Sequence, residues 1–343
     1  MVSERGLEVL RVIVQDYVAS REPVGSKSIV ERHAFGVSAA TIRNDMALLE
    51  DEELITAPHT SSGRVPTDKG YRVFVDQLTD LRPLTPAQRQ AIETFVGQSV
   101  DLDDVLARTV RLLSQLTHQV ALVQYPSLAS SKVRHIELVP LSTTRLMSVF
   151  ITDTGRVEQR LVETAGDLDE AFLADLRTRL NSTLGGLGLS DAAARLESFP
   201  EQFAPERRPL VVQVTSSLTE QVLANRQDRL LMAGAANLAR TEEDFSGSIF
   251  PVLEAIEEQV TLLRLFGEME LDSTGSGVAV SIGKENADFG LGQTSVLTSG
   301  YSTSGGSVAR LGVLGPTRMD YSNNMAAVRA VARYLSRLLG PTD

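Results

Sequence analysis

The sequence predicts a multidomain α+β protein, and three observations lead to this fold class. Its 343 residues exceed the usual size of a single domain. The first 80 residues combine helical spacing of apolar side chains with a short hairpin pattern, whereas residues 120–162 and 278–314 contain runs typical of β-strands. Helical patterns occupy most of the stretch between the two strand-rich regions. We therefore expect an antiparallel sheet with flanking helices, interrupted by a largely helical insertion.

The composition excludes several classes of protein. The chain has no cysteine, so disulfide scaffolds, thiolate zinc sites and iron–sulfur clusters are ruled out. The four histidines show neither metal-ligand spacing nor a Ser/His/Asp order, and we predict no metal, no cofactor and no enzymatic activity. Apolar runs stay below the ~18 residues of a membrane span, and a signal pattern is missing. The expected location is the cytoplasm.

The charge balance limits how the chain can bind nucleic acid. The formal net charge is -11, and residues 1–80 hold nine basic and thirteen acidic side chains. Net charge governs nonspecific attraction but does not decide specific readout. Any DNA contact must therefore come from a few well-placed cations, with the carboxylates turned away.

The first three elements are predicted to be helices joined by short turns. Apolar residues recur at helical spacing from Glu4 to Ala19, a short helix follows over residues 27–32, and Ser38 is placed to cap a third helix that ends near Glu52. The turn at 34–36 ends on a glycine, which accepts positive φ. A short turn of this kind between the second and third helices is the helix-turn-helix pattern.

The third helix presents two chemically different faces at 100° per residue. Ile42, Met46 and Leu49 share one side, which we expect to pack on the first helix. The opposite side is small and polar, so it can approach base edges in the major groove: Asn44 can pair with adenine and Arg43 with guanine or phosphate. The candidate DNA contacts before the hairpin are Lys27, Ser38, Ala40, Thr41, Arg43 and Asn44.

A hairpin pattern with an arginine follows the third helix. Residues 54–58 and 64–66 are predicted as short strands around the turn 59–63, which places Arg64 at the hairpin tip. Helix, turn, polar-faced helix and hairpin in this order favour a winged helix over a coincidental three-helix packing. The candidate contacts in the hairpin are His59, Thr60, Ser61, Gly63 and Arg64. With Lys27, Arg43 and Arg64 and one or two of Lys69 and Arg72 engaged, each copy of the chain would make ~3–5 phosphate contacts.

Several segments resemble the HrcA family of bacterial heat-inducible transcription repressors. In the N-terminal region they are Glu22–Lys27, Val37–Met46 and Pro58–Arg72. Near the C-terminus they are Gly283–Asn286 and Gly312–Tyr321, together with Tyr301 and Gly305. Ser62 and Val65 replace the Ala and Ile expected for the family, and both are mild changes. The resemblance therefore brackets the chain, although the middle is weakly patterned.

The resemblance implies a function and a division of the chain. It implies a homodimeric repressor of heat-shock chaperone operons. Such a repressor binds the inverted-repeat CIRCE operator on double-stranded DNA, so it associates with the nucleoid when bound. It is released from the operator on heat shock. The resemblance also implies the GroE chaperonin as a modulator. The implied segments are a winged helix DNA-binding domain over 1–80, linker helices and the first part of a GAF-like domain over 81–165, an inserted dimerisation domain over 166–245, and the second part of the GAF-like domain over 246–343.

Some interpretations stay open at this stage. A GAF-like domain that binds a small-molecule effector would make the chain a ligand-sensing regulator, but with 5% aromatic residues and no tryptophan we favour a scaffold. The apolar stripe over 102–116 is expected to be core rather than a dimer seam. Gly283-Lys284-Glu285 lacks the phosphate-loop pattern, and we expect a strand-to-loop turn. Thr317–Asp320 is expected to be a helix-capping box.

Overall fold

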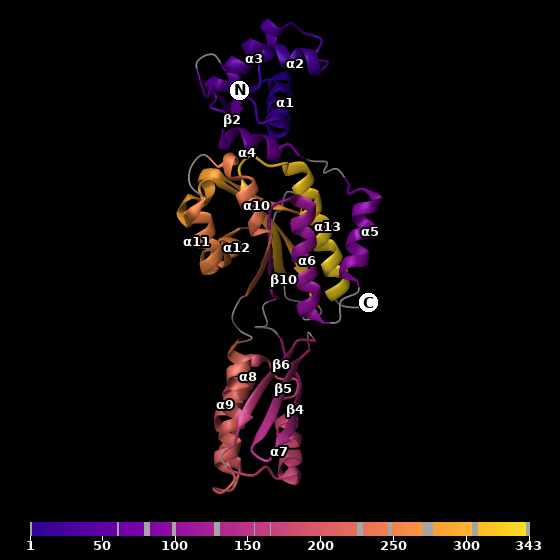
Figure 1. The fold of residues 1–343 in the computed structure, drawn as a ribbon, viewed down its shortest axis with the longest axis vertical. Helices are drawn as coiled ribbons and strands as arrows, with labels where there is room; N and C mark the ends of the chain where they lie inside the picture. The colour runs from indigo at the N-terminus through magenta and orange to yellow at the C-terminus, as the bar shows by residue number, and fades with distance from the viewer. Residues whose placement is uncertain are drawn as a thin grey trace.

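The computed structural model is elongated, with three successive units along its length (Figure 1). It describes residues 2–59, 62–78, 83–97, 101–126, 131–153, 155–164, 166–224, 229–245, 249–269, 277–303 and 308–340. We call residues 2–78 the N-terminal unit, residues 83–126 with 229–340 the central unit, and residues 131–224 the distal unit. Among the described helices, none is both long and apolar enough to cross a bilayer.

The N-terminal unit is a helical bundle with a two-stranded sheet. Its elements are α1 (Glu4–Ser20), α2 (Ser26–Arg32), α3 (Ala39–Asp51), β1 (Ile55–Thr56), β2 (Val65–Pro66) and α4 (Asp68–Asp76). The three predicted helices are confirmed, and Ile13, Ile42 and Leu49 meet in a fully buried core. This core is continuous with that of the central unit.

The central unit is built on a five-stranded antiparallel sheet with strand order β7-β3-β10-β9-β8. Its strands are β3 (Val120–Gln124), β7 (Leu230–Ala233), β8 (Ala279–Ile282), β9 (Thr294–Ser302) and β10 (Val308–Pro316). Its helices are α5 (Pro86–Val96), α6 (Leu102–Thr117), α10 (Ala235–Arg240), α11 (Phe250–Glu258), α12 (Val260–Glu268) and α13 (Tyr321–Leu339). On β10, Val313 faces α6 and α13, whereas Leu314 faces α11 and α12, because side chains alternate along a strand.

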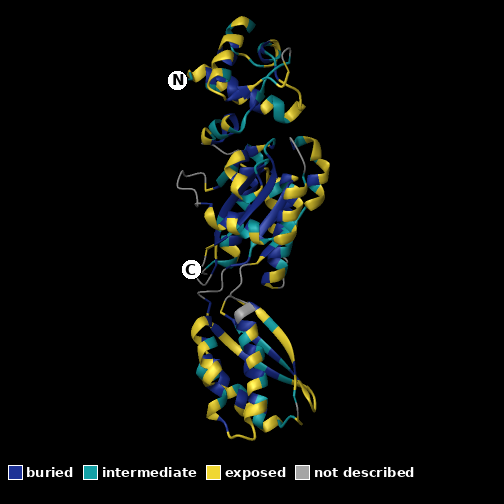
Figure 2. Cartoon of the chain, turned by 90° about the vertical axis from the view of Figure 1, so that its left-hand side faces the viewer, coloured by how far each residue is buried: buried dark blue, intermediate teal, exposed yellow. Residues whose placement is uncertain are grey.

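The distal unit has its own three-stranded antiparallel sheet with strand order β4-β5-β6. Its elements are β4 (Val133–Ser142), β5 (Arg145–Thr152), β6 (Val157–Glu163), α7 (Glu170–Leu184), α8 (Leu189–Ser198) and α9 (Arg208–Ala224). Leu146 and Phe150 of β5 are buried with Leu176, Leu180 and Val214 of the helices. Figure 2 shows such buried residues inside each unit and exposed residues along the outer helix faces.

The partners of these strands differ from those that the sequence predicts. Residues 133–162 do form strands, but they are not part of the interrupted sheet. Of the strand runs between 120 and 162, β3 alone pairs with β10 and β7 in the central sheet. Hydrophobic alternation predicts that a segment is a strand but not which strand it pairs with, and β4, β5 and β6 are close enough in sequence to pair with one another.

The distal unit is inserted between two chain segments that lie side by side. The chain leaves the central sheet after β3 and returns in β7, which is the neighbour of β3. The backbone N–H of Tyr125 donates to the carbonyl of Arg229 at 2.8 Å. The guanidinium groups of Arg156, from the distal unit, and Arg229 lie 5.3 and 5.0 Å from the Tyr125 ring centroid. These contacts close the insertion at its base.

The remaining local predictions have mixed outcomes. The stripe on α6 is core, as expected, because Leu106 and Leu113 are fully buried. The segment Gly283–Phe289 forms a 3-10 helix, η4, directly after β8. The capping box at Thr317 is wrong: the carboxylate of Asp320 accepts from the N–H of Asn323 at 3.0 Å and caps α13, while the carbonyl of Thr317 accepts from the hydroxyl of Tyr321.

Candidate DNA-binding interface

Helix α3 has the two faces that the sequence predicts. Ile42, Met46 and Leu49 are buried against the rest of the N-terminal unit. Ala40, Arg43, Asn44 and Ala47 are exposed, and Thr41 is half-buried. The small side chains allow close approach of another surface, so this exposed face is shaped for a groove.

The exposed cations and amide of this region have no competing partner among the residues that the structure describes. Lys27, at the start of α2, is exposed, as are Arg43 and Asn44. Within the described ranges, these three side chains make no hydrogen bond or ion pair with another residue. Ser38 caps α3: its hydroxyl accepts from the N–H of Thr41 at 3.2 Å. Ser38 thus fixes the start of the helix while remaining exposed.

A charge pair that the sequence analysis did not anticipate holds α3 in place. The carboxylate of Asp45 is buried and accepts from Nε and Nη2 of Arg5 at 2.7 and 3.1 Å. This bidentate contact joins α1 to the buried side of α3, one residue after Asn44. The contact spans 40 residues, and helical periodicity carries no signal for it.

The hairpin is held against the loop between α1 and α2. The backbone groups of Val24 and Arg64 exchange hydrogen bonds of 2.9 Å in both directions, which adds a third bridge beside β1 and β2. A Cβ on Gly63 would lie 2.6 Å from backbone atoms of Pro23, so only glycine permits this approach. His59 is exposed, and its backbone N–H donates to the hydroxyl of Ser62 at 3.0 Å. Thr60 and Ser61 lie outside the described residues.

Arg64 is not at the hairpin tip, in contrast to the sequence prediction. It lies at the bridge to Val24, and its Nε and Nη2 contact the carboxylate of Glu50 at 2.9 and 2.8 Å. Glu50 is in the last turn of α3, so this pair braces the hairpin against the helix. Glu50 draws the arginine inward, which the position of Arg64 in the turn does not reveal.

Lys69 and Arg72 are likewise engaged within the protein rather than free for phosphates. The ammonium of Lys69 donates to the carbonyl of Glu52 at 2.8 Å. Nε of Arg72 donates to the carboxylate of Glu285 in η4 at 2.8 Å. Nearby, the N–H of Lys284 donates to the carboxylate of Asp68 at 3.0 Å. Helix α4 is therefore a junction with the central unit.

A second junction ties α1 to the central unit. The carboxylate of Asp244 accepts from Nε of Arg318 at 2.7 Å and from Nη2 of Arg21 at 3.0 Å. Nη1 of Arg318 also donates to the carbonyl of Val18 at 2.7 Å. These partners are distant in sequence, so composition and spacing could not find them. The two segments near the C-terminus that resemble the HrcA family contain both Glu285 and Arg318.

The described residues show no group of three or more histidine, aspartate or glutamate side chains that could hold a metal ion. A small helical unit that exposes the polar face of α3, and that is fastened to a larger α+β body, defines a transcription regulator. A family model described as "HrcA protein C terminal domain" matches residues 103–325. The chain belongs to the HrcA family of heat-inducible transcription repressors. It is therefore a repressor and not an enzyme.

Full-length relatives and one solved structure agree with this assignment. The heat-inducible transcription repressor HrcA of Clavibacter michiganensis subsp. michiganensis is 78% identical over 339 residues, 99% of both chains. That of Leifsonia xyli subsp. xyli is 68% identical over 340 residues, 99% of this chain and 100% of the relative. A crystal structure described as that of a hypothetical protein is 26% identical, covers 98% of both chains and superposes with a TM-score of 0.71.

Proposed function

We propose that the chain represses chaperone operons by binding, as a dimer, the inverted-repeat CIRCE operator through two winged helices. The observation that carries this proposal is the exposed face of α3, where Arg43 and Asn44 have no partner among the described residues while the opposite face is buried. A recognition helix in the major groove needs these side chains at base edges. Two symmetric copies then read the two half-sites.

The other candidate residues take supporting roles in this proposal. Lys27 contacts a phosphate, while Ser38, Ala40 and Thr41 lie at the groove-facing start of α3. His59, Thr60, Ser61 and Gly63 form the wing and contact the backbone or the adjacent minor groove. Arg64 acts as a positioning residue, because its guanidinium is already bound to Glu50.

The geometry of the operator provides the test of this function. Purified full-length protein should protect both half-sites of the inverted repeat in a footprint. Adding about five base pairs between the half-sites turns one of them by half a helical turn, whereas adding about ten restores the phase. We expect the first insertion to reduce affinity strongly and the second to restore part of it. Equal binding to both spacings would contradict a rigid dimer that reads two half-sites.

We also propose that the open face of the distal sheet is the dimer contact. All three helices of the distal unit share one core with Leu146 and Phe150, so the alternate residues of β5 lie on the other face. There Met147 is paired in register with Leu161 and Ile151 with Val157. Leu161 is 67% exposed and Val157 47% exposed. An exposed sheet face that carries apolar pairs of this kind is typical of a contact with a second copy.

The same proposal revises the division of the chain. The central unit corresponds to the GAF-like domain of the family, with its sheet completed by strands from both sides of the insertion. The inserted dimerisation domain then corresponds to the distal unit, 131–224, rather than to residues 166–245. Support for these boundaries comes from the separate core of the distal unit and from the backbone contact between Tyr125 and Arg229.

A chaperonin of the GroE type is proposed to set the fraction of active repressor. Strand β3 pairs with β10, whose residues follow about 190 positions later, so the central sheet forms through distant contacts. Apolar strands stay exposed until those contacts form, and a chaperonin binds such surfaces. Refolding from denaturant at constant temperature, with and without chaperonin and ATP, tests this. Equal recovery of operator binding would exclude the chaperonin and leave direct thermal sensing.

A further inference from the structure

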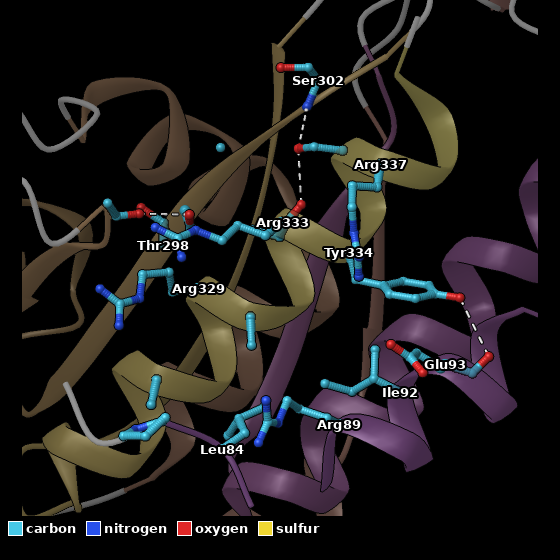
Figure 3. Close-up of a pocket in the computed structure, with 18 of the residues that line it drawn as sticks. Leu84, Arg89, Ile92, Glu93, Thr298, Ser302, Arg329, Arg333, Tyr334 and Arg337 are labelled. Carbon is cyan, nitrogen blue, oxygen red and sulfur yellow. Dashed lines mark hydrogen bonds between the residues drawn. The ribbon is translucent and has the colours of Figure 1, made fainter. Parts of the chain in front are cut away.

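A cavity of about 910 Å³ lies in the central unit, between α5, α13 and β9 (Figure 3). Its volume is that of a small-molecule site. One part of its wall is apolar and is formed by Leu84, Ile92, Val308, Ala326 and Ala330. The other part carries four arginines: Arg89, Arg329, Arg333 and Arg337. None of these residues belongs to the proposed DNA-binding interface or to the open face of the distal sheet.

The arginines gather on this cavity because of their spacing. Arg329, Arg333 and Arg337 follow one another at four-residue intervals on α13 and so share one side of the helix. Arg89 approaches from α5, and Figure 3 shows its side chain beside Leu84, on the other side of α13 from Arg329 and Arg333. Like charges at this spacing repel one another.

The protein provides little neutralising charge at this point. Among the described residues that line the cavity, Glu93 is the one acidic side chain. Arg89 and Arg333 are exposed and form no ion pair within the described part of the chain. Burial and the charge of Arg333 lower the pKa of Arg329. Two arginines without an ion pair beside an apolar wall are notable in a chain whose net charge is -11.

We propose that this cavity binds a small amphipathic anion. The guanidinium group of Arg333 holds its carboxylate or phosphate head, since arginine donates paired hydrogen bonds to both groups, and the charge of Arg89 attracts the anion from the other side of α13. Its apolar body lies against Leu84, Ile92 and Ala330. A purely ionic ligand would leave this wall exposed to water, and a purely apolar ligand would leave the arginines in mutual repulsion. The site adds ligand binding to the repressor activity.

The probe for this site is 1-naphthyl phosphate, followed by its fluorescence anisotropy with the full-length protein. The chain has no tryptophan, so the naphthyl signal is free of tryptophan emission. We expect saturable binding with one site per chain. Inorganic phosphate, which lacks the apolar body, and 1-naphthol, which lacks the anion, should each compete at least about tenfold more weakly. Displacement by 1-naphthoate with a Kd at or below that of 1-naphthyl phosphate would assign the head as a carboxylate, and a higher Kd would assign it as a phosphate; either outcome supports the site.

Two variants separate the charges from the wall. Arg89→Gln with Arg333→Gln should weaken binding at least about tenfold, because the charge-assisted contacts of Arg333 and the attraction of Arg89 are lost. Ala330→Leu should weaken it by filling the cavity without a change of charge. The matched control, Arg134→Gln with Arg195→Gln, removes the same charge from exposed positions of the distal unit and should leave binding unchanged. The proposal is overturned if wild-type protein shows no saturable binding, or if control and cavity variants bind alike.

Discussion

Arg318 and Asp244 form a buried ion pair between the segment that precedes α13 and the segment that follows α10. The same pair holds the C-terminal end of α1 beside these segments. Their side chains are 10% and 4% exposed, and Nε of Arg318 lies 2.7 Å from the carboxylate. Arg21 of the N-terminal unit binds the same carboxylate, and Val18 accepts a further hydrogen bond from Arg318. One carboxylate thus sets how the N-terminal unit is held on the body of the repressor.

Asp244→Asn should therefore destabilise the protein and weaken operator binding. The substitution leaves the buried Arg318 without a counter-charge, which typically costs ~3–5 kcal/mol of unfolding free energy. Denaturant unfolding and operator titration measure the two effects. Glu243→Gln is the matched control, because Glu243 is 87% exposed and contacts Arg21 at 3.5 Å. Equal effects of the two substitutions would show that the buried pair does not hold the junction.

Arg43→Ala and Asn44→Ala should each reduce discrimination between operator and random DNA. Each loses a bidentate contact to a base, which is worth ~1–3 kcal/mol. Arg64→Ala should instead weaken binding to all sequences, because it releases the hairpin from Glu50. Competition titrations with operator and scrambled duplexes give the ratio. An unchanged ratio for Asn44→Ala would mean that another face of α3 reads the bases.

Operator affinity should depend on salt less steeply than the sequence alone suggests. Arg64, Lys69 and Arg72 are bound within the protein, which leaves Lys27 and Arg43 as the exposed cations of the proposed interface. Two copies then bring ~4 cations to the DNA, the two Lys27 side chains at phosphates and the two Arg43 side chains at bases, for a log–log slope of about −2 to −4. Titrations over a range of salt concentrations measure this slope. A slope of about −5 to −9 would instead show that the internal ion pairs open on DNA.

Leu161→Glu should convert the dimer to a monomer in sedimentation, because it places a charge in the apolar face of the distal sheet. Val212→Glu is the control. Val212 is 47% exposed on α9, and this helix packs against the opposite face of the sheet. We expect this variant to stay dimeric. A dimeric Leu161→Glu protein, or a monomeric Val212→Glu protein, would place the contact elsewhere.

Tyr71→Phe should raise the stability of the repressor by ~1 kcal/mol, because the buried hydroxyl of Tyr71 has no hydrogen-bond partner among the described residues. Tyr321→Phe should lower it, since that hydroxyl contacts Ser295 and Thr317 at 2.7 Å. The two rings are neighbours, with centroids 5.6 Å apart. Thermal unfolding of both variants at neutral pH makes the comparison, and an equal loss in both would contradict it.

The same tyrosine predicts a dependence on alkaline pH. Burial, and secondarily the neighbouring Tyr321, raises the pKa of Tyr71 well above its ordinary value. The folded state therefore favours the neutral phenol, and this contribution is fully present below the unfolded pKa of ~10. It is lost as the pH rises above that value. Tyr71→Phe should lose less stability than wild type over this alkaline range.

Local sequence patterns are sufficient to predict the three helices at the start of the N-terminal unit and the buried side of α3. The spacing of Ile42, Met46 and Leu49 predicted the buried side of α3 because neighbouring turns of one helix determine that side. The pattern could not predict where Arg64 points, because its direction depends on Glu50, fourteen residues earlier and on a different element. Exposure was predictable, whereas the partner of each charged side chain was not.

Long-range pairing was the part that sequence reasoning could not supply. The alternation in β4, β5 and β6 identified strands but assigned them to the wrong sheet, since the same alternation suits either. Arg72 and Glu285 are 213 residues apart, and the arginines of the cavity come from both α5 and α13. Each of these features forms only after the chain has folded, so neither spacing nor composition contains it.

The contact between Tyr125 and Arg229 has a consequence for how such a chain can arise and be altered. Because the two ends of the distal unit meet at one backbone hydrogen bond, a single in-frame gene insertion between β3 and β7 is enough to add it to the central sheet. The same place can accept a different domain in exchange for residues 131–224. Under the proposed dimer contact, such a graft would choose which copies assemble while leaving the proposed reading helix, α3, unchanged.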